Sequence, residues 1–197
     1  WASTNYVALS GDDSDGSDWD HAFHSLQAAV DASSDNDFIF LKQGAYTNNT
    51  GNIIVSNKVL TIRGGYEGVG DPGNYTNDAA LTVLDADGSN RVLYVVNCTT
   101  GLMEGVTIRN GKLGGTANGA GVSLSSSIYH FLNCLIRENS LYSGNGIGIF
   151  ISGGSLILEE SQVRNNSNTS TSTANINGGG LAIRSDATAL ISHSIIA

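Results

Sequence analysis

Basic residues are scarce in this sequence. Its 197 residues include only nine lysines and arginines against 18 aspartates and glutamates, and the formal net charge at pH 7 is −9. Nucleic acids and anionic membrane surfaces are bound by clustered lysine and arginine, so the shortage excludes both as predicted partners. Long apolar runs are lacking as well. None approaches the ~20 residues that a membrane span needs, and we predict no membrane insertion.

Proline and cysteine are also nearly absent. Pro72 is the only proline although there are 25 glycines, and this profile does not suit a proline-rich disordered linker. Cys98 and Cys134 are the only cysteines, which is too few for a disulfide framework. Whether they are bonded to each other stays open at this point. The chain begins at Trp1 rather than at methionine, so we expect a processed or excised segment.

The residues that are abundant favour strands. Apolar residues make up 40% of the chain, which is enough for a core. Glycine, asparagine, serine and threonine are frequent, whereas stretches rich in leucine, glutamate and lysine are rare. This composition is typical of many short strands joined by turns. The length suits one domain, 1–197.

A short pattern of an apolar residue followed by arginine recurs along the chain, as LTIRG, VTIRN, LIREN and QVRNN. Two further apolar series run in step with it, one of them GVSL, GIFI and GLAI. Three short strands in each repeat of ~25 residues predict a β-solenoid. The aligned apolar positions, with steps of 21, 25, 28, 27 and 32 residues, are Ile62, Val83, Ile108, Ile136, Val163 and Ile195.

Strand alternation explains the pattern. In VTIR, Val106 and Ile108 point to one side, and Thr107 and Arg109 point to the other. We expect the apolar pair to face the inside of the solenoid and the polar pair to face water. The next coil repeats the arrangement ~4.8 Å away. Asparagine or glycine then forms the corner, and asparagines stacked at one corner can pair with each other.

Several of these motifs resemble those of a known group of proteins. GGGLAI (178–183) and GNGIGIF (144–150) are similar to the GGA-I repeats of polymorphic outer-membrane proteins, and IREN (136–139) and VRNN (163–166) are similar to their F-x-x-N repeats, with Ile or Val replacing the aromatic residue. The chain thus resembles the right-handed parallel β-helix superfamily of extracellular proteins, which includes pectate-lyase-like repeat proteins. The resemblance implies an all-β, right-handed parallel β-helix in an extracellular or cell-surface location. It does not imply one function, because the fold hosts lyases, hydrolases, adhesins and scaffolds.

The predicted domain has two parts. Residues 1–36 supply a strand, an acidic loop and a capping helix, and 37–197 supply six to seven coils of three short strands each. The helix is predicted over 17–32, with Ser17 as its N-cap. Its apolar stripe, which would plug the open end of the solenoid, consists of Trp19, Phe23, Leu26 and Val30.

The other end of the predicted solenoid has no plug. The sequence ALISHSIIA stops in mid-pattern, and a bare coil presents unpaired backbone groups and an open core. Three explanations are open. The chain is a fragment of a longer surface protein, which we favour; a further segment completes the end; or another copy stacks there to give an oligomer or fibre.

An acidic loop precedes the predicted helix. Asp13, Asp15 and Asp18 offer the hard oxygen ligands that calcium prefers, and apart from calcium at this loop we expect no cofactor. The EF-hand spacing is not met, since the twelfth position counted from Asp13 is His24 rather than Glu. The alternative is a solvated loop whose acids favour a helix N-terminus.

The recurring arginines are the main candidates for chemistry. Arg109, Arg137 and Arg164 are predicted at equivalent outward positions on consecutive coils, where they could bind acidic sugars. The resemblance adds that pectate lyases use an arginine base beside calcium held by aspartates. No aspartate cluster flanks these arginines, so an ion-paired or solvated ladder is the simpler interpretation.

A carboxylate pair is the second candidate. Glycoside hydrolases need two carboxyl groups ~5–5.5 Å or ~6.5–9.5 Å apart. Asp85 and Glu138 are predicted in one corner column two coils apart, hence at ~9.6 Å by the stacking distance. No other acid supports the pair.

Five sequons for N-glycosylation are present, at Asn48, Asn74, Asn97, Asn165 and Asn168.

Taken together, the residues favour a non-catalytic extracellular structural or adhesive module that can assemble end to end, so that its partner is another copy of itself. The alternative is a carbohydrate-active enzyme, either a polysaccharide lyase or a glycoside hydrolase, or a sugar-binding domain whose partner is a polysaccharide.

Overall fold

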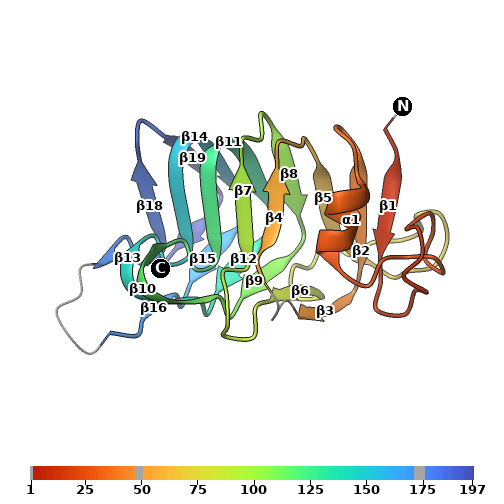
Figure 1. Ribbon diagram of the computed structural model, residues 1–197, viewed down its shortest axis with the longest axis horizontal. Coiled ribbons are helices and arrows are strands. Elements are labelled where there is room, and N and C mark those ends of the chain that lie inside the picture. Colours follow the sequence, from red (N-terminus) through yellow and green to blue (C-terminus); the bar gives the residue numbers. More distant parts are fainter. Residues whose placement is uncertain (1, 48–50, 171–175) are drawn as a thin grey trace.

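The computed structural model describes residues 2–47, 51–170 and 176–197. The protein is nearly all-β, with 51% of its residues in strands and 4% in a helix. All pairs between named strands are parallel. Figure 1 shows the strands side by side along the long axis, with the two ends of the chain at opposite ends of the stack. The predicted parallel, solenoid-like architecture is therefore present.

The largest sheet bends into two panels. Panel one contains β4 (Ile53–Ser56), β7 (Leu93–Val96), the first halves of β11 (Val122–Leu132) and β14 (Ile149–Glu159), and β18 (Leu181–Arg184). Panel two contains β1 (Thr4–Val7), β2 (Phe38–Lys42), β5 (Thr61–Tyr66), β8 (Gly101–Glu104), the second halves of β11 and β14, and β19 (Thr188–Ser192).

Panel three is a separate six-stranded sheet. It contains β3 (Gly44–Thr47), β6 (Thr82–Asp85), β9 (Thr107–Arg109), β12 (Leu135–Arg137), β15 (Gln162–Arg164) and β20 (Ile195–Ile196). The chain visits panels two, three and one in turn, so each repeat has the three strands that the sequence predicts. In β11 and β14, however, two of these strands join into one 11-residue strand that turns the corner.

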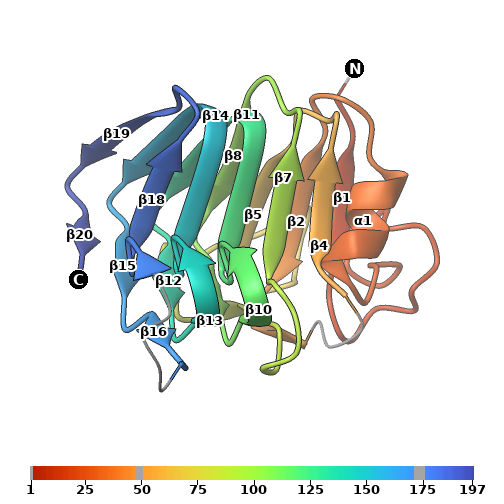
Figure 2. The same cartoon turned by 60° about the vertical axis from the view of Figure 1, so that its left-hand side comes forward.

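A small lateral sheet projects beside the main stack (Figure 2). It contains β10 (Lys112–Asn118), β13 (Ser140–Asn145), β16 (Ser167–Asn168) and β17 (Ile176–Asn177). These segments follow the panel-three strands in successive repeats. In the repeats that begin at β9, β12 and β15, they supply residues that lie between panel three and panel one.

The core consists of apolar columns that run along the stack. In panel three, Ile108, Ile136 and Val163 stand in register and are fully buried, as predicted. The prediction was wrong for the other three aligned positions, which do not lie in this column. Val83 and Ile195 are displaced by one residue, pairing with Thr107 and Gln162. Ile62 lies in panel two, opposite Met103. The full panel-three column is Tyr46, Leu84, Ile108, Ile136, Val163 and Ile196.

Corners are formed by residues in the left-handed region, as expected for asparagine and glycine. After panel three, Asn110, Glu138 and Asn165 have φ values of 57°, 58° and 55°. The next residues form the predicted asparagine ladder, because the Asn139 side-chain amide donates to Asn166 Oδ1 at 3.0 Å. The corner thus satisfies backbone and side-chain polar groups within the stack.

The helix is much shorter than predicted. α1 covers Leu26–Ala32, and its N-cap is Ser25, whose hydroxyl accepts from the Ala28 amide. The prediction was wrong for 17–25, where Asp18 instead closes a local turn by accepting from the backbone amides of the residues that follow it. Trp19 therefore lies outside the main core, with its ring 4.6 Å from the ring of Tyr6.

Both cysteines are buried free thiols, so no disulfide joins Cys98 and Cys134. Among residues 2–47, 51–170 and 176–197, no helix combines the length and the apolar character that crossing a membrane requires.

Candidate functional site

The three arginines predicted to share a column do so. Arg109 pairs with Arg137 and Arg137 with Arg164, each at the end of its panel-three strand. The column extends one strand further, because Asp85 in β6 lies opposite Arg109. The alternation of these strands turns all four side chains away from the buried column of Ile108, Ile136 and Val163. The series therefore lies on the outside of panel three.

Asp85 and Arg109 form the best-defined contact of the column. Arg109 Nε donates to Asp85 Oδ2 at 2.8 Å, and the Asn110 side-chain amide donates to both carboxylate oxygens at 2.9 and 3.0 Å. Burial would raise the pKa of Asp85, but hydrogen bonds from the Asp87 and Asn110 amides and from Arg109 outweigh it. The pKa of Asp85 therefore lies below its usual range, and the group is a carboxylate at neutral pH.

The two later arginines are less completely paired. Arg137 forms an ion pair with the adjacent Glu138, whereas Arg164 has no ion-pair partner among the described residues. The Nε atoms of Arg137 and Arg164 are both buried without a hydrogen-bond partner in the described part of the chain. The pairing of charge thus weakens along the column from Asp85 towards the C-terminal end.

Asp85 and Glu138 do not share a column, contrary to the prediction. Asp85 is opposite Arg109, whereas Glu138 follows Arg137 and occupies the corner position of Asn110. A glycosidase general acid must hold its proton near neutral pH, and the lowered pKa of Asp85 favours the opposite state. The lowered pKa therefore does not suit the general-acid role, and the contacts place the Asp85 carboxylate in an ion pair with Arg109.

A shallow groove of about 210 Å³ adjoins the arginine column. It is lined by the loop at 77–80, by Asn133 and Glu160 at the preceding corner, and by Gln162 and Arg164 of β15. The loop is fixed in place, since the Asn133 side-chain amide donates to Asn77 Oδ1 at 2.6 Å. The groove therefore offers amides, carboxylates and one cation to a polar ligand.

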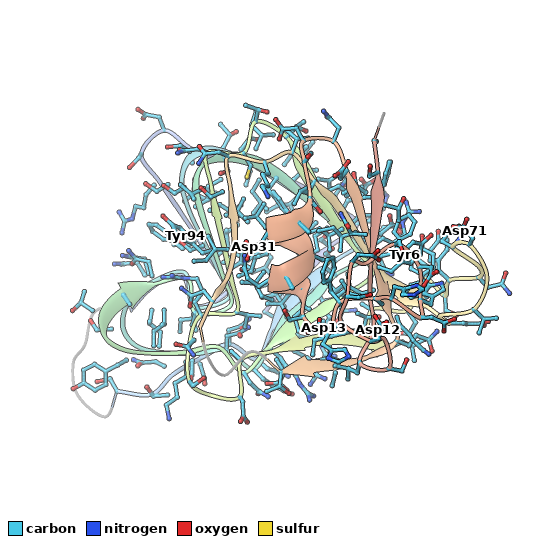
Figure 3. All side chains as sticks on the ribbon, turned by 45° about the vertical axis from the view of Figure 1, so that its right-hand side comes forward. Tyr6, Asp12, Asp13, Asp31, Asp71 and Tyr94 are labelled. Carbon is cyan, nitrogen blue, oxygen red and sulfur yellow. The ribbon has the colours of Figure 1, made fainter. Side chains whose placement is uncertain are left out.

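The acidic loop uses its carboxylates locally. Asp13 Oδ1 accepts from the His24 amide, and Asp15 Oδ1 accepts from the Ser17 amide. Hydrogen bonds from the Ser17 side chain and from its amide lower the pKa of Asp15. Asp18 accepts from the His21 amide and ring, which lowers its pKa and raises the pKa of His21. Figure 3 shows Asp13 with Asp12 on this loop at the N-terminal end. Across the described residues, no group of three or more His, Cys, Asp or Glu side chains is placed to hold a metal ion.

The sequons lie on the surface where they are described. Asn74, Asn97, Asn165 and Asn168 are exposed, and Asn97 and Asn165 occupy left-handed corner positions. Asn48 lies outside the described residues.

Two contacts were not anticipated from the sequence. Arg63 Nε donates to Glu104 Oε2 at 2.7 Å across panel two, a pair that the correct alignment of Ile62 would have found. Gln27 of α1 bonds to the backbone of Ile54 in β4, and no sequence signal distinguishes it from an ordinary surface glutamine.

Comparisons of the chain with models of protein families, with curated proteins and with solved structures find no match.

Proposed function

We propose that the chain is a right-handed parallel β-helix with six coils, one for each strand of panel three. The parallel register of β6, β9, β12 and β15 supports this topology, as does the regular order in which the chain visits the three panels. Parallel strands joined by crossovers of this kind favour a right-handed path.

The helix α1 closes the N-terminal end of this β-helix. Leu26, Ala29 and Val30 are buried in the main core, beside the first strand of panel one. Gln27 Oε1 accepts from the Ile54 amide at 2.7 Å, and its side-chain amide donates to the Ile54 carbonyl at 3.3 Å. The side chain thereby supplies the hydrogen bonds that a preceding strand would supply, which is how an exposed sheet edge is protected.

The function that the geometry supports best is that of a non-catalytic structural or adhesive module. The observation that carries this proposal is the unbroken register of the buried column and of the outward column beside it. Such stacking gives a stiff rod, because each coil is held by its neighbours through backbone bonds and side-chain ladders. Asp85 and Arg109 fit this role, since their charges bind each other.

An extracellular location is part of the same proposal. It is supported by the resemblance to secreted β-helix proteins and by the exposure of Asn74, Asn97, Asn165 and Asn168. Expression in a glycosylating secretory host, followed by glycosidase treatment, tests whether these sequons are used. Loss of the mobility shift in the Asn-to-Gln variants would assign each site.

Sugar binding is the second candidate, favoured by one observation. Arg164 has no ion-pair partner in the described chain and lines a polar groove with Gln162, Asn133 and Glu160. A polysaccharide could place hydroxyl groups on the amides and an acidic group on the arginine. Calcium at Asp13, Asp15 and Asp18 would belong to this candidate rather than to the scaffold.

One screen separates the two candidates. The protein is incubated with neutral and acidic polysaccharides, with and without calcium, and both retention and new chain ends are measured. If the protein is a scaffold, it cleaves none of the polysaccharides, and Arg164 does not affect whether any of them is retained. Turnover that is lost in Arg137→Ala or Arg164→Ala, while the variant remains folded, would replace the structural assignment by an enzymatic one.

A further inference from the structure

A long connection leads from panel two to panel three between β5 and β6. We call its residues, 67–81, the strap. The equivalent corners of the later repeats have only two residues each, at 105–106, 133–134, 160–161 and 193–194. The extra length lets the strap run along the edge between the two panels, where it contacts strands in both directions from β5.

The first anchor of the strap is on β1 and on the acidic loop that precedes α1. Tyr6 Oη donates to Asp71 Oδ1 at 2.6 Å, and Trp19 Nε1 donates to the Pro72 carbonyl at 3.0 Å. Tyr6 and Trp19 are both buried, so water competes little for these bonds. Figure 3 shows Tyr6 and Asp71 next to each other. The acidic loop is itself bonded to β1, because the Phe23 amide donates to the Tyr6 carbonyl at 2.9 Å.

The strap is folded back on itself beside β5. The Thr76 amide donates to the Gly65 carbonyl at 2.9 Å. The Tyr75 ring lies 5.5 Å from the ring of Tyr66, and the Arg63 guanidinium lies over the same Tyr75 ring at 5.2 Å. The segment between the two ends of the strap is therefore a bonded structure that can pass a displacement from one end to the other.

The second anchor is on the strands that follow β6. Thr107 Oγ1 in β9 donates to the Ala79 carbonyl at 2.8 Å. At the next corner, the Asn133 side-chain amide donates to Asn77 Oδ1 at 2.6 Å and to the Asn77 carbonyl at 3.1 Å. Strand alternation turns Thr107 to the outer side of panel three, where we expected it to face water, yet it is fully buried. The strap thus covers this part of the outer face.

The two anchors lie on coils that are not neighbours. In the sheet order β1, β2, β5, β8 and β11, four steps separate β1 from the strand that precedes Asn133, which corresponds to ~19 Å. In a simple solenoid each repeat contacts only its neighbours, so a change at one coil reaches a distant coil only through those between them. The strap adds a connection that bypasses the intermediate coils.

We propose that the strap couples β1 and the acidic loop to the corner at Asn133, so that these segments open together as one unit. This coupling goes beyond the scaffold function and does not depend on it, since it would be the same in a sugar-binding module. It predicts that loosening one anchor weakens the structure at the other, although the two anchors do not touch.

The test loosens the second anchor and measures the first. Asn133→Gly removes the side chain that holds Asn77, and glycine adopts the φ of 48° at this position without strain. Native-state hydrogen exchange of the Phe23 amide, which donates to the Tyr6 carbonyl, should become about tenfold faster, the effect of one lost hydrogen bond. Asn97→Gly is the matched control, because Asn97 is an exposed corner residue with a φ of 55°, and it should leave this amide unchanged.

A double variant distinguishes coupling from two independent losses. Tyr6→Phe removes the bond to Asp71 and keeps the ring, and it should also accelerate exchange of the Phe23 amide about tenfold. If the strap couples its anchors, Tyr6→Phe combined with Asn133→Gly should fall well short of the product of about a hundredfold that independent sites give.

Asn77→Ala loosens the same anchor from the side of the strap, so that the test does not depend on how well Asn133→Gly folds. It should accelerate exchange of the Phe23 amide as Asn133→Gly does. Acceleration confined to amides near the corner at Asn133, or a full product of the two effects in the double variant, would overturn the proposal. Cleavage and retention of polysaccharides are measured separately, so failure of the strap and failure of the scaffold function can be told apart.

Discussion

Asp85 and Arg109 lie opposite each other on β6 and β9, and the Arg109 Nε atom donates to Asp85 Oδ2 at 2.8 Å. The aspartate occupies the same outward column as Arg137 and Arg164. One carboxylate at the head of an arginine series offsets the repulsion that like charges one coil apart would otherwise produce. The contact therefore links the register of the strands to the charge balance of panel three.

Replacing Asp85 should destabilise the protein. In Asp85→Asn the side chain keeps its size, but Arg109 loses its ion pair and the Asn110 amide meets another amide. We expect a loss of about 1–3 kcal/mol in the free energy of unfolding, measured by urea denaturation, because a hydrogen-bonded, largely buried pair is broken. Glu138→Gln is the matched control, since that carboxylate is exposed at the corner and its removal should cost less than about 1 kcal/mol.

Asp85 should also make the free energy of unfolding depend on pH. The folded pKa of Asp85 lies below its ordinary value, since its hydrogen bonds and Arg109 outweigh the effect of burial. Its contribution is therefore fully present above the unfolded pKa of about 3.9 and is lost as the pH falls through the folded pKa. The difference in unfolding free energy between the protein and Asp85→Asn should stay constant near neutral pH and shrink on acidification. A difference that grows in acid would contradict the assignment.

The panel-three column shows what a sequence can and cannot specify in this fold. Ile108, Ile136 and Val163 were placed correctly because each lies in a strand with clear alternation and precedes an arginine. Val83 was misplaced because all four residues of β6 are buried, so the period of two is hidden. Ile195 and Ile196 are adjacent and equally apolar, and only the pairing with Val163 shows which of them faces inwards.

The wrong predictions for Ile62 and for the start of the helix have different physical causes. The residues TIR occur both around Ile62 and around Ile108, yet β5 pairs with β2 and β8 in panel two. Local sequence does not encode which panel a strand joins. The helix was extended to 17 because Trp19 and Phe23 fit an apolar stripe, whereas both pack on parts of the chain far away in sequence. Tertiary contacts, and turns closed by hydrogen bonds from backbone amides to side chains, therefore determine the structure of 17–25.

The asparagine ladder should contribute strongly to stability. Asn139 is fully buried, its amide donates to the Arg137 carbonyl and to Asn166, and its carbonyl accepts from the Gly111 amide at 2.8 Å. Asn139→Ala leaves buried backbone groups unpaired, each at a cost of about 1–3 kcal/mol. The measurement is the free energy of unfolding in urea.

The neighbouring corner residue supplies the control for that experiment. Asn165 is exposed and has a φ of 55°, a conformation that glycine adopts without strain. Asn165→Gly should therefore change the stability by less than about 1 kcal/mol. Equal effects of the two substitutions would show that the corner geometry, rather than the buried ladder, is what the asparagines provide.

The buried thiols should be unreactive in the folded protein. Burial raises the pKa of Cys134 to about 12, and its Sγ atom donates to the carbonyls of Met103 and Leu132. The thiolate is the reactive form, so alkylation at mildly alkaline pH should modify Cys134 only after unfolding. Mass spectrometry of the peptide that contains Cys134, with and without denaturant, measures this. Fast labelling without denaturant would show that the core opens around β12.

Gln27 provides the sharpest test of the closed N-terminal end. Gln27→Ala removes both side-chain bonds to the Ile54 backbone, and we expect a loss of about 1–2 kcal/mol together with faster hydrogen exchange of the Ile54 amide. Asp31→Ala is the matched control on the same helix, because it removes only the contact between Asp31 and Gln27. If the Ile54 amide stays equally protected in Gln27→Ala, the edge of β4 is held by packing of Leu26 and Val30, and the glutamine is not what closes it.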